Sequence, residues 1–167
     1  MKLNSMKDLY VDQLRDLYSA EDQLTQALPK MAQAASSSDL QKAFRDHLQQ
    51  TRDQKQRLEQ IFSDMGMSPQ GQTCQAMQGL IKEGEDIINA HADSTVKDAA
   101  LIAAAQRVEH YEMAGYGSVR TFADELGFSD AKSLLQKTLD EEGATDKKLT
   151  SLAEGGLFSS GINKKAV

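Results

Sequence analysis

The residues of this 167-residue chain that could do chemistry are mainly carboxylates and amides, together with three histidines. Four glutamates stand apart because each interrupts a stripe of apolar residues that recurs every three or four positions: Glu21, Glu109, Glu112 and Glu142. A carboxylate that is buried alone is costly, so a cluster of buried carboxylates needs a metal ion, protons or cationic partners. These spacings indicate a polar layer inside a helical core. The alternative is that each glutamate reaches solvent from the edge of its stripe.

Three further residues could complete such a site. Asp146 follows Glu142 by one helical turn and could supply another oxygen donor. His47 could bind a metal ion through its imidazole, although a single histidine on a half-buried helix face is more often a hydrogen-bonded structural residue. Gln50 would place a neutral amide where an acidic ligand would be expected. A structural role therefore stays open for each of them.

The elements that would position these residues are helices. Hydroxyl residues that resemble helix N-caps occur at Ser5-x-x-Asp8, Ser38-x-x-Gln41 and Thr95-x-x-Asp98. Glycines that can end a helix in the left-handed conformation occur at Gly66, Gly127 and Gly155-Gly156. No segment shows the period-two alternation of a strand. The sequence therefore predicts an all-α protein with five helices, over residues 6–35, 38–65, 74–92, 96–126 and 129–154.

The four long helices are expected to form an antiparallel four-helix bundle, with the helix over 74–92 as an additional short element. Each long helix carries polar residues near its mid-length, and the midpoints of neighbouring antiparallel helices fall in one layer. Bundles hold di-iron and di-manganese centres with hard oxygen donors from four helices. Such centres also use two Glu-x-x-His motifs, and this chain contains none. Iron, manganese and no metal at all therefore stay open.

Four strings around the candidate residues are distinctive: Tyr18-Ser-Ala-Glu21-Asp-Gln-Leu24, Asp98-Ala-Ala-Leu-Ile-Ala-Ala-Ala-Gln106, Val108-Glu-His-Tyr-Glu-Met-Ala114 with Tyr116-Gly117, and Leu139-Asp-Glu-Glu142 with Thr145-Asp146. They resemble the YciF/YciE family of bacterial ferritin-like, rubrerythrin-like stress-response proteins, over residues 6–153. The resemblance implies a helical bundle, usually dimeric, with a role in stress responses. It also implies a carboxylate cluster on Glu21, Glu109, Glu142, Glu112 and Asp146.

The second helix departs from that family pattern. The family commonly reads His-Leu-Glu-Glu-Thr there, whereas this chain reads His47-Leu-Gln-Gln-Thr51, so both acids are amides. We therefore expect a ferritin-like stress-response protein that is mainly structural or protective, with a degenerate or weak metal site in its core. The alternatives are a carboxylate-bridged di-iron or di-manganese oxidoreductase acting on dioxygen or peroxide, and a module that binds a partner protein. Whether the protein is an enzyme stays open.

Composition and charge limit the partners and the cellular compartment that we expect for this protein. The net charge of −6 disfavours nucleic acid and anionic membranes as partners. The longest uncharged apolar run, residues 99–105, is too short to cross a membrane, and the single cysteine excludes an internal disulfide and fits a cytoplasmic protein. We expect one bundle domain over residues 1–155 and a polar tail over 156–167.

A second apolar face on the helix over 96–126 bears on assembly. It consists of Leu101, Ala104, Val108, Tyr111 and Gly115. Such a face must be covered, either by the short helix over 74–92 or by a second subunit. Together with the prevalence of two-fold symmetric assemblies, this face predicts a homodimer.

Overall fold

The structure is a computed structural model that describes residues 3–156 and 159–167. Within these residues the regular secondary structure is helical except for one very short strand pair, which confirms the predicted all-α fold. The elements are α1 (Met6–Ala34), α2 (Ser38–Asp64), α3 (Gln75–Asn89), α4 (Ser94–Glu125), α5 (Ser129–Glu154), β1 (Gly155–Gly156), β2 (Ser159–Ser160) and α6 (Ile162–Lys165). None of the helices in the described residues is long and apolar enough to cross a membrane.

Helix starts agree with the sequence at α1 and differ at α2 and α4. Ser5 caps α1, accepting a hydrogen bond of 3.1 Å from the amide of Asp8, as predicted. The cap of α2 is Ser37 rather than Ser38, and the cap of α4 is Asp93 rather than Thr95. Thr95-x-x-Asp98 is not a capping box, because the Asp98 carboxylate is used elsewhere.

Both oxygens of Asp98 accept backbone amides from the loop between α1 and α2. The amides of Ser36 and Ser37 donate to them over 2.8 and 2.7 Å. Negative charge next to the first amides of α2 is favourable, so this contact fixes the α1–α2 turn onto α4.

The C-terminal ends of three helices agree with the sequence prediction. The glycines that follow them, Gly66, Gly127 and Gly155, have φ of 66°, 74° and 81°.

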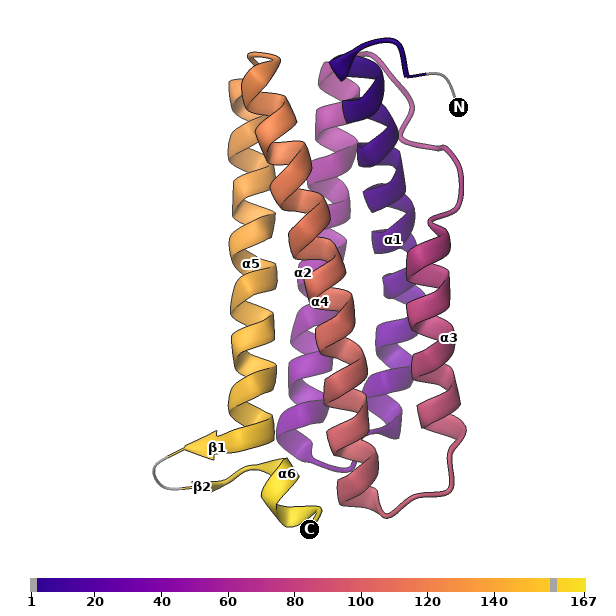
Figure 1. Cartoon of the computed structure of the whole chain (residues 1–167), viewed down its shortest axis with the longest axis vertical. Coiled ribbons are helices and arrows are strands. Elements are labelled where there is room, and N and C mark those ends of the chain that lie inside the picture. Colours follow the sequence, from indigo (N-terminus) through magenta and orange to yellow (C-terminus); the bar gives the residue numbers. More distant parts are fainter. Residues whose placement is uncertain (1–2, 157–158) are drawn as a thin grey trace.

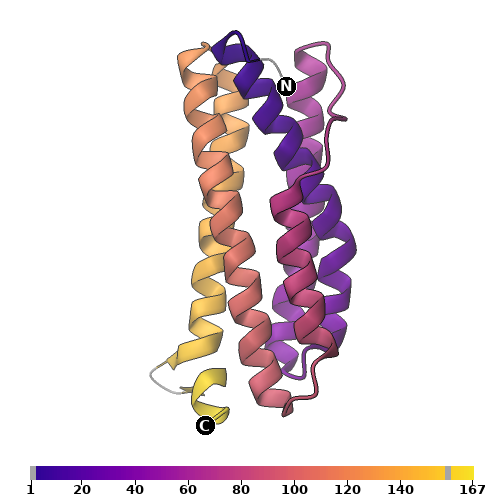
Figure 2. The same cartoon turned by 45° about the vertical axis from the view of Figure 1, so that its right-hand side comes forward.

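The four long helices form two antiparallel hairpins, α1 with α2 and α4 with α5 (Figure 1). The hairpins pack side by side through α1 against α4 and α2 against α5, so every neighbouring pair is antiparallel. The long connection after α2 runs back along the bundle and allows α3 to lie against α1 and α4, outside the four-helix core (Figure 2). This arrangement brings the mid-length segments of the four long helices into one layer.

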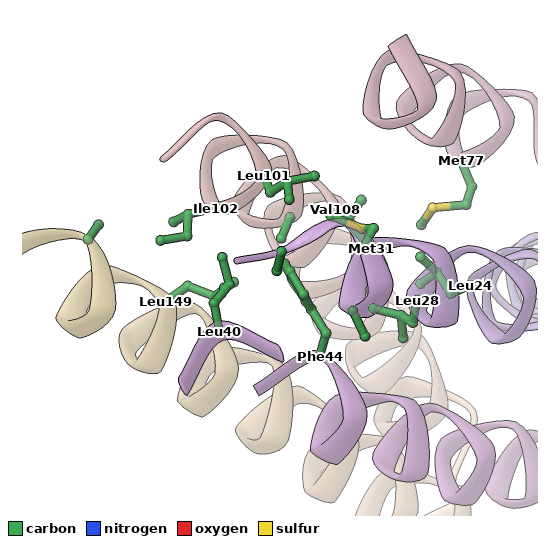
Figure 3. Packing of buried hydrophobic residues seen from close by; sticks show 14 of the residues in the cluster. Leu24, Leu28, Met31, Leu40, Phe44, Met77, Leu101, Ile102, Val108 and Leu149 are labelled. Carbon is green, nitrogen blue, oxygen red and sulfur yellow. The ribbon is translucent and has the colours of Figure 1, made fainter. Parts of the chain in front are cut away.

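Two hydrophobic clusters fill the core, one at each end of the bundle. The first contains Leu28, Phe44, Ile102 and Leu149, and Figure 3 shows side chains of this cluster from α1, α2, α4 and α5 packed together. The second contains Tyr10, Leu14, Phe62, Tyr116 and Leu135. Each fully buried side chain of this size contributes about 1.5–3 kcal/mol to folding. In each long helix the buried polar residues near mid-length lie at the boundary between the two clusters, whereas the buried Asp98 lies near the start of α4.

The end of the chain is docked onto the bundle. Gly155 pairs with Ser160 and Gly156 with Ser159, a short antiparallel pairing that the sequence analysis did not predict. Ile162, in the predicted polar tail, is buried in the first hydrophobic cluster. A Cβ on Gly161 would lie 2.2 Å from the carbonyl carbon of Glu154, so only glycine permits this close approach. Residues 157–158 of the tail lie outside the described residues.

The second apolar face of α4 is covered by α3. Leu101, Ala104 and Val108 are all at most 7% exposed, and Leu80 and Ile81 of α3 pack against the cluster that contains them. Tyr111 is half-buried and donates a hydrogen bond to Asp16 of α1. Of the two expected ways to cover this face, the short helix is the one observed. This face therefore gives no support to a homodimer, which stays a prediction.

Candidate metal centre

The polar layer consists of residues that share a helix face by their spacing. On α2, the positions 47, 51 and 54 lie on one face, and on α4 the positions 109 and 112 do so as well. The buried polar residues of the layer are Glu21, His47, Thr51, Gln54, Glu109, Glu112, Thr138 and Glu142, and none is more than 3% exposed. Local sequence alone makes these segments helical, but only the packing of four helices removes all eight side chains from water.

Four of these side chains converge on one point. His47, Glu109, Glu112 and Glu142 each offer a ligand atom, and these atoms all lie within 4.8 Å of one another. The His47 Nε2 atom lies 3.2 Å from Glu109 Oε1. Three of the glutamates selected from the sequence, and the histidine considered with them, are therefore brought together by α2, α4 and α5.

Glu21 borders this group and is held by a tyrosine. The Tyr116 hydroxyl, fully buried on α4, donates a hydrogen bond to Glu21 Oε1. Glu21 is not one of the four residues whose ligand atoms converge. No role for the Tyr116 hydroxyl was predicted from the sequence. The signal was its position one turn after Glu112 on the same face.

Asp146 and Gln50 have polar partners outside the four converging residues. Asp146 Oδ1 accepts a hydrogen bond of 3.0 Å from Gln106 Nε2 and lies 3.4 Å from His110 Nε2. Gln50 is half-buried, and its Oε1 atom accepts a hydrogen bond of 3.4 Å from the Thr145 hydroxyl. A role for Asp146 as a metal ligand stays a prediction, and so does the expectation that Gln50 is a neighbour of the metal site.

Burial and mutual repulsion perturb the ionisation of the layer. Burial raises the pKa of Glu21 to about 8, against the opposing effect of the Tyr116 hydrogen bond. Burial, followed by the neighbouring carboxylates, raises the pKa of Glu112 and Glu142 well above the usual range. Burial alone would lower the pKa of His47, but the carboxylates of Glu109 and Glu21 outweigh it and the pKa is raised. Without a cation, some of these carboxyl groups must therefore hold protons at neutral pH.

The donor set fits a hard divalent metal ion. Within the described residues, both oxygens of Glu112 and of Glu142, one oxygen of Glu109 and both ring nitrogens of His47 are buried without a hydrogen-bond partner. Buried polar atoms without partners are rare, and a cation at this point would interact with the carboxylate oxygens and with one ring nitrogen of His47. Carboxylate oxygens with one imidazole suit manganese or iron, whereas the soft thiolates that favour copper(I) are missing from this group.

An ion pair beside the layer was not anticipated from the sequence. Arg57 of α2 binds Glu141 of α5 through its two terminal guanidinium nitrogens, at 2.7 and 2.8 Å, and also donates to the Thr138 hydroxyl over 3.0 Å. The positive charge of Arg57 favours the ionised form of Glu21. The available signal was the spacing of Arg57 one turn after the buried Gln54.

An all-α bundle with a buried histidine–carboxylate layer between two hydrophobic clusters is the class of protein that this fold and this site define. A family model described as a domain of unknown function, DUF892, matches residues 5–166. The chain therefore belongs to the DUF892 family. It is 46% identical to protein YciF of Escherichia coli (strain K12), over 99% of this chain and 98% of that relative, which confirms the resemblance seen in the sequence.

Solved structures agree with the assignment. The crystal structure of the E. coli stress protein YciF has a TM-score of 0.87 and 46% identity, covering 90% of this chain and 95% of its own. YcfI from Rhodopseudomonas palustris, provisionally described as a structural protein, has a TM-score of 0.88 and 45% identity, covering 91% and 97%. A protein from Xanthomonas campestris pv. campestris, at 16% identity and a TM-score of 0.70, covering 88% and 89%, shares the fold.

Proposed function

We propose that this protein is a ferritin-like stress-response protein with a structural or protective role, and that its polar layer binds a single iron or manganese ion. The stress role follows the description of its relative, the E. coli stress protein YciF. The observation that carries the metal proposal is the convergence of ligand atoms from His47, Glu109, Glu112 and Glu142 within 4.8 Å, all buried. In this proposal these four side chains bind the ion, and Tyr116 orients Glu21 beside it.

One ion fits the donors better than two. Two divalent ions at the usual separation of about 3.5–4 Å repel each other and need bridging carboxylates. At position 50 of the second helix, where the family commonly carries an acid, this chain carries an amide. His47 is the only histidine in the converging group, so imidazoles do not compensate. A bound iron or manganese ion would supply redox chemistry, and the two hydrophobic clusters would keep bulk water away from it.

The test is metal titration followed by elemental analysis of protein prepared without chelator. We expect one equivalent of iron(II) or manganese(II) per chain, and loss of binding in Glu142→Gln, which removes one of the converging carboxylates. Glu125→Gln is the matched control, because Glu125 is exposed near the end of α4. Failure of the unmodified chain to bind either ion at millimolar concentration would contradict the metal proposal.

A dinuclear oxidoreductase is the second candidate, and the position of Glu21 favours it. Glu21 lies close enough to the converging residues to affect the ionisation of His47, and it is a fourth buried carboxylate at the edge of the layer. This function requires two equivalents of metal per chain and turnover of peroxide or dioxygen. The same titration therefore separates the two candidates.

A further inference from the structure

Gln54 is a buried residue of the polar layer to which neither the sequence nor the family pattern assigns a role. It lies on α2, seven residues after His47 and three after Thr51, on the face that carries both. Its side chain is 1% exposed. The Nε2 atom donates a hydrogen bond of 3.3 Å to Glu141 Oε2.

The ion pair with Arg57 determines which way the Gln54 amide points. Arg57 holds both oxygens of Glu141 at 2.7 and 2.8 Å, so this carboxylate is fixed in place. An ionised carboxylate can only accept hydrogen bonds, and therefore the NH2 group of Gln54, not its carbonyl, must face it. The Gln54 Oε1 atom is consequently turned away from Glu141.

The Oε1 atom has no donor where it lies. Within the described residues it is buried without a hydrogen-bond partner, and so is the hydroxyl oxygen of Thr51 one turn earlier on the same face. The other unpartnered polar atoms of the layer are carboxylate oxygens, the ring nitrogens of His47 and the Thr51 hydroxyl, and none of them is hydrogen-bonded to the Gln54 Oε1 atom. A cation satisfies a carbonyl oxygen and the carboxylates together.

We infer that Gln54 Oε1 is an additional, neutral oxygen ligand of the cation in this layer, and that Glu141 and Arg57 are positioning residues that hold it in that orientation. The inference rests on the proposed function. The number of ligands also indicates which class of metal the layer prefers. His47 and three glutamates would satisfy the four-coordinate preference of zinc, whereas manganese(II) prefers about six oxygen-rich ligands. Gln54 therefore favours manganese(II) or iron(II) over zinc.

The experiment compares manganese(II) and zinc(II) binding by calorimetric titration of the full chain. Gln54→Met keeps the length of the side chain but removes the hard oxygen. We expect its dissociation constant for manganese(II) to rise by at least about tenfold. Its zinc(II) affinity should change by less than about twofold, because zinc does not need the extra ligand. The electron paramagnetic resonance spectrum of bound manganese(II) should also change.

Two further variants complete the comparison. Gln54→Leu provides a second removal of the oxygen if Gln54→Met does not fold. Gln56→Leu is the matched control, because Gln56 is exposed on the same helix, and it should bind both metals like the unmodified chain.

The outcomes separate this inference from the proposal on which it rests. If the unmodified chain binds neither metal, the proposed function is wrong. If the unmodified chain binds manganese(II) and the Gln54 variants bind it equally well, only the role of Gln54 is overturned. An equal loss of manganese(II) and zinc(II) affinity would show that Gln54 acts through the fold rather than as a ligand, and would also overturn the inference.

Discussion

At the scale of single residues, position 50 decides how much negative charge the second helix brings to the layer. Gln50 is half-buried and contacts Thr145 on α5, and it lies one turn after His47 on the same helix. A carboxylate at this position would lie at the edge of the converging group. It would add to the charge that holds a divalent ion.

We therefore predict that Gln50→Glu raises iron or manganese occupancy, because it restores an acid next to His47. Gln49→Glu is the control: Gln49 is exposed and donates to Asp53 over 2.9 Å, so an acid there should leave metal binding unchanged. Titration followed by elemental analysis of both variants provides the measurement. An unchanged occupancy in Gln50→Glu would mean that this side chain does not reach the ion.

At the scale of elements, the short helix α3 covers the second apolar face of α4. Cys74 is the N-cap of α3. Its backbone amide donates to the Ser19 hydroxyl over 2.9 Å, and its thiol lies 3.2 Å from Asp16 and 3.0 Å from Tyr111. Burial raises the pKa of the Cys74 thiol. The start of α3 is thus attached to both α1 and α4, and the apolar face of α4 is closed.

A charged residue at position 108 should consequently unfold the chain rather than separate subunits. We predict that Val108→Asp lowers the free energy of unfolding by at least about 3 kcal/mol, because it places an unpaired charge under α3. Val96→Asp is the matched control, since Val96 is exposed in the first turn of α4 and an acid there is neutral or slightly favourable. Urea denaturation measures the loss of folding stability, and analytical ultracentrifugation measures any separation of subunits. A folded Val108→Asp monomer from a dimeric parent would contradict this interpretation.

At the scale of the whole molecule, the buried layer makes stability depend on pH. The pKa of Glu21 is about 8 in the folded protein because of burial, against an ordinary value of 4.5. Between these values the folded state retains a proton that the unfolded chain has released, so the free energy of unfolding falls as pH rises. The raised pKa values of Glu112, Glu142 and His47 act in the same direction.

We therefore predict that the free energy of unfolding of the metal-free protein is lower at about pH 8 than at about pH 5. The difference should be on the order of one to several kcal/mol, as measured by urea denaturation. Glu21→Gln should reduce this dependence, because glutamine does not titrate and can still accept the Tyr116 hydrogen bond. Metal binding should show the opposite trend, since the ligands must lose protons first. A metal-free protein that gains stability over this pH range would contradict the assignment of protonated carboxyls to the layer.

Much of the fold follows from local rules that a sequence expresses directly. The apolar spacing of the long helices, the cap at Ser5 and the glycines at 66, 127 and 155 are properties of short segments, and they predicted the helices to within a few residues. The polar layer was predictable for the same reason. An interrupted stripe places Glu21, Glu109 and Glu142 near mid-length, and antiparallel packing aligns those positions.

What the tertiary structure decided depends on contacts between segments that are far apart in the sequence. It brought His47 to Glu109, Glu112 and Glu142 and left Asp146 with Gln106 and His110. It also used α3 to cover α4 and buried Ile162 of the polar tail. The orientation of Gln54 required Arg57 and Glu141, which are 84 residues apart. A helix spacing fixes which face a residue occupies, but the side chains that meet there are determined only when all the helices pack.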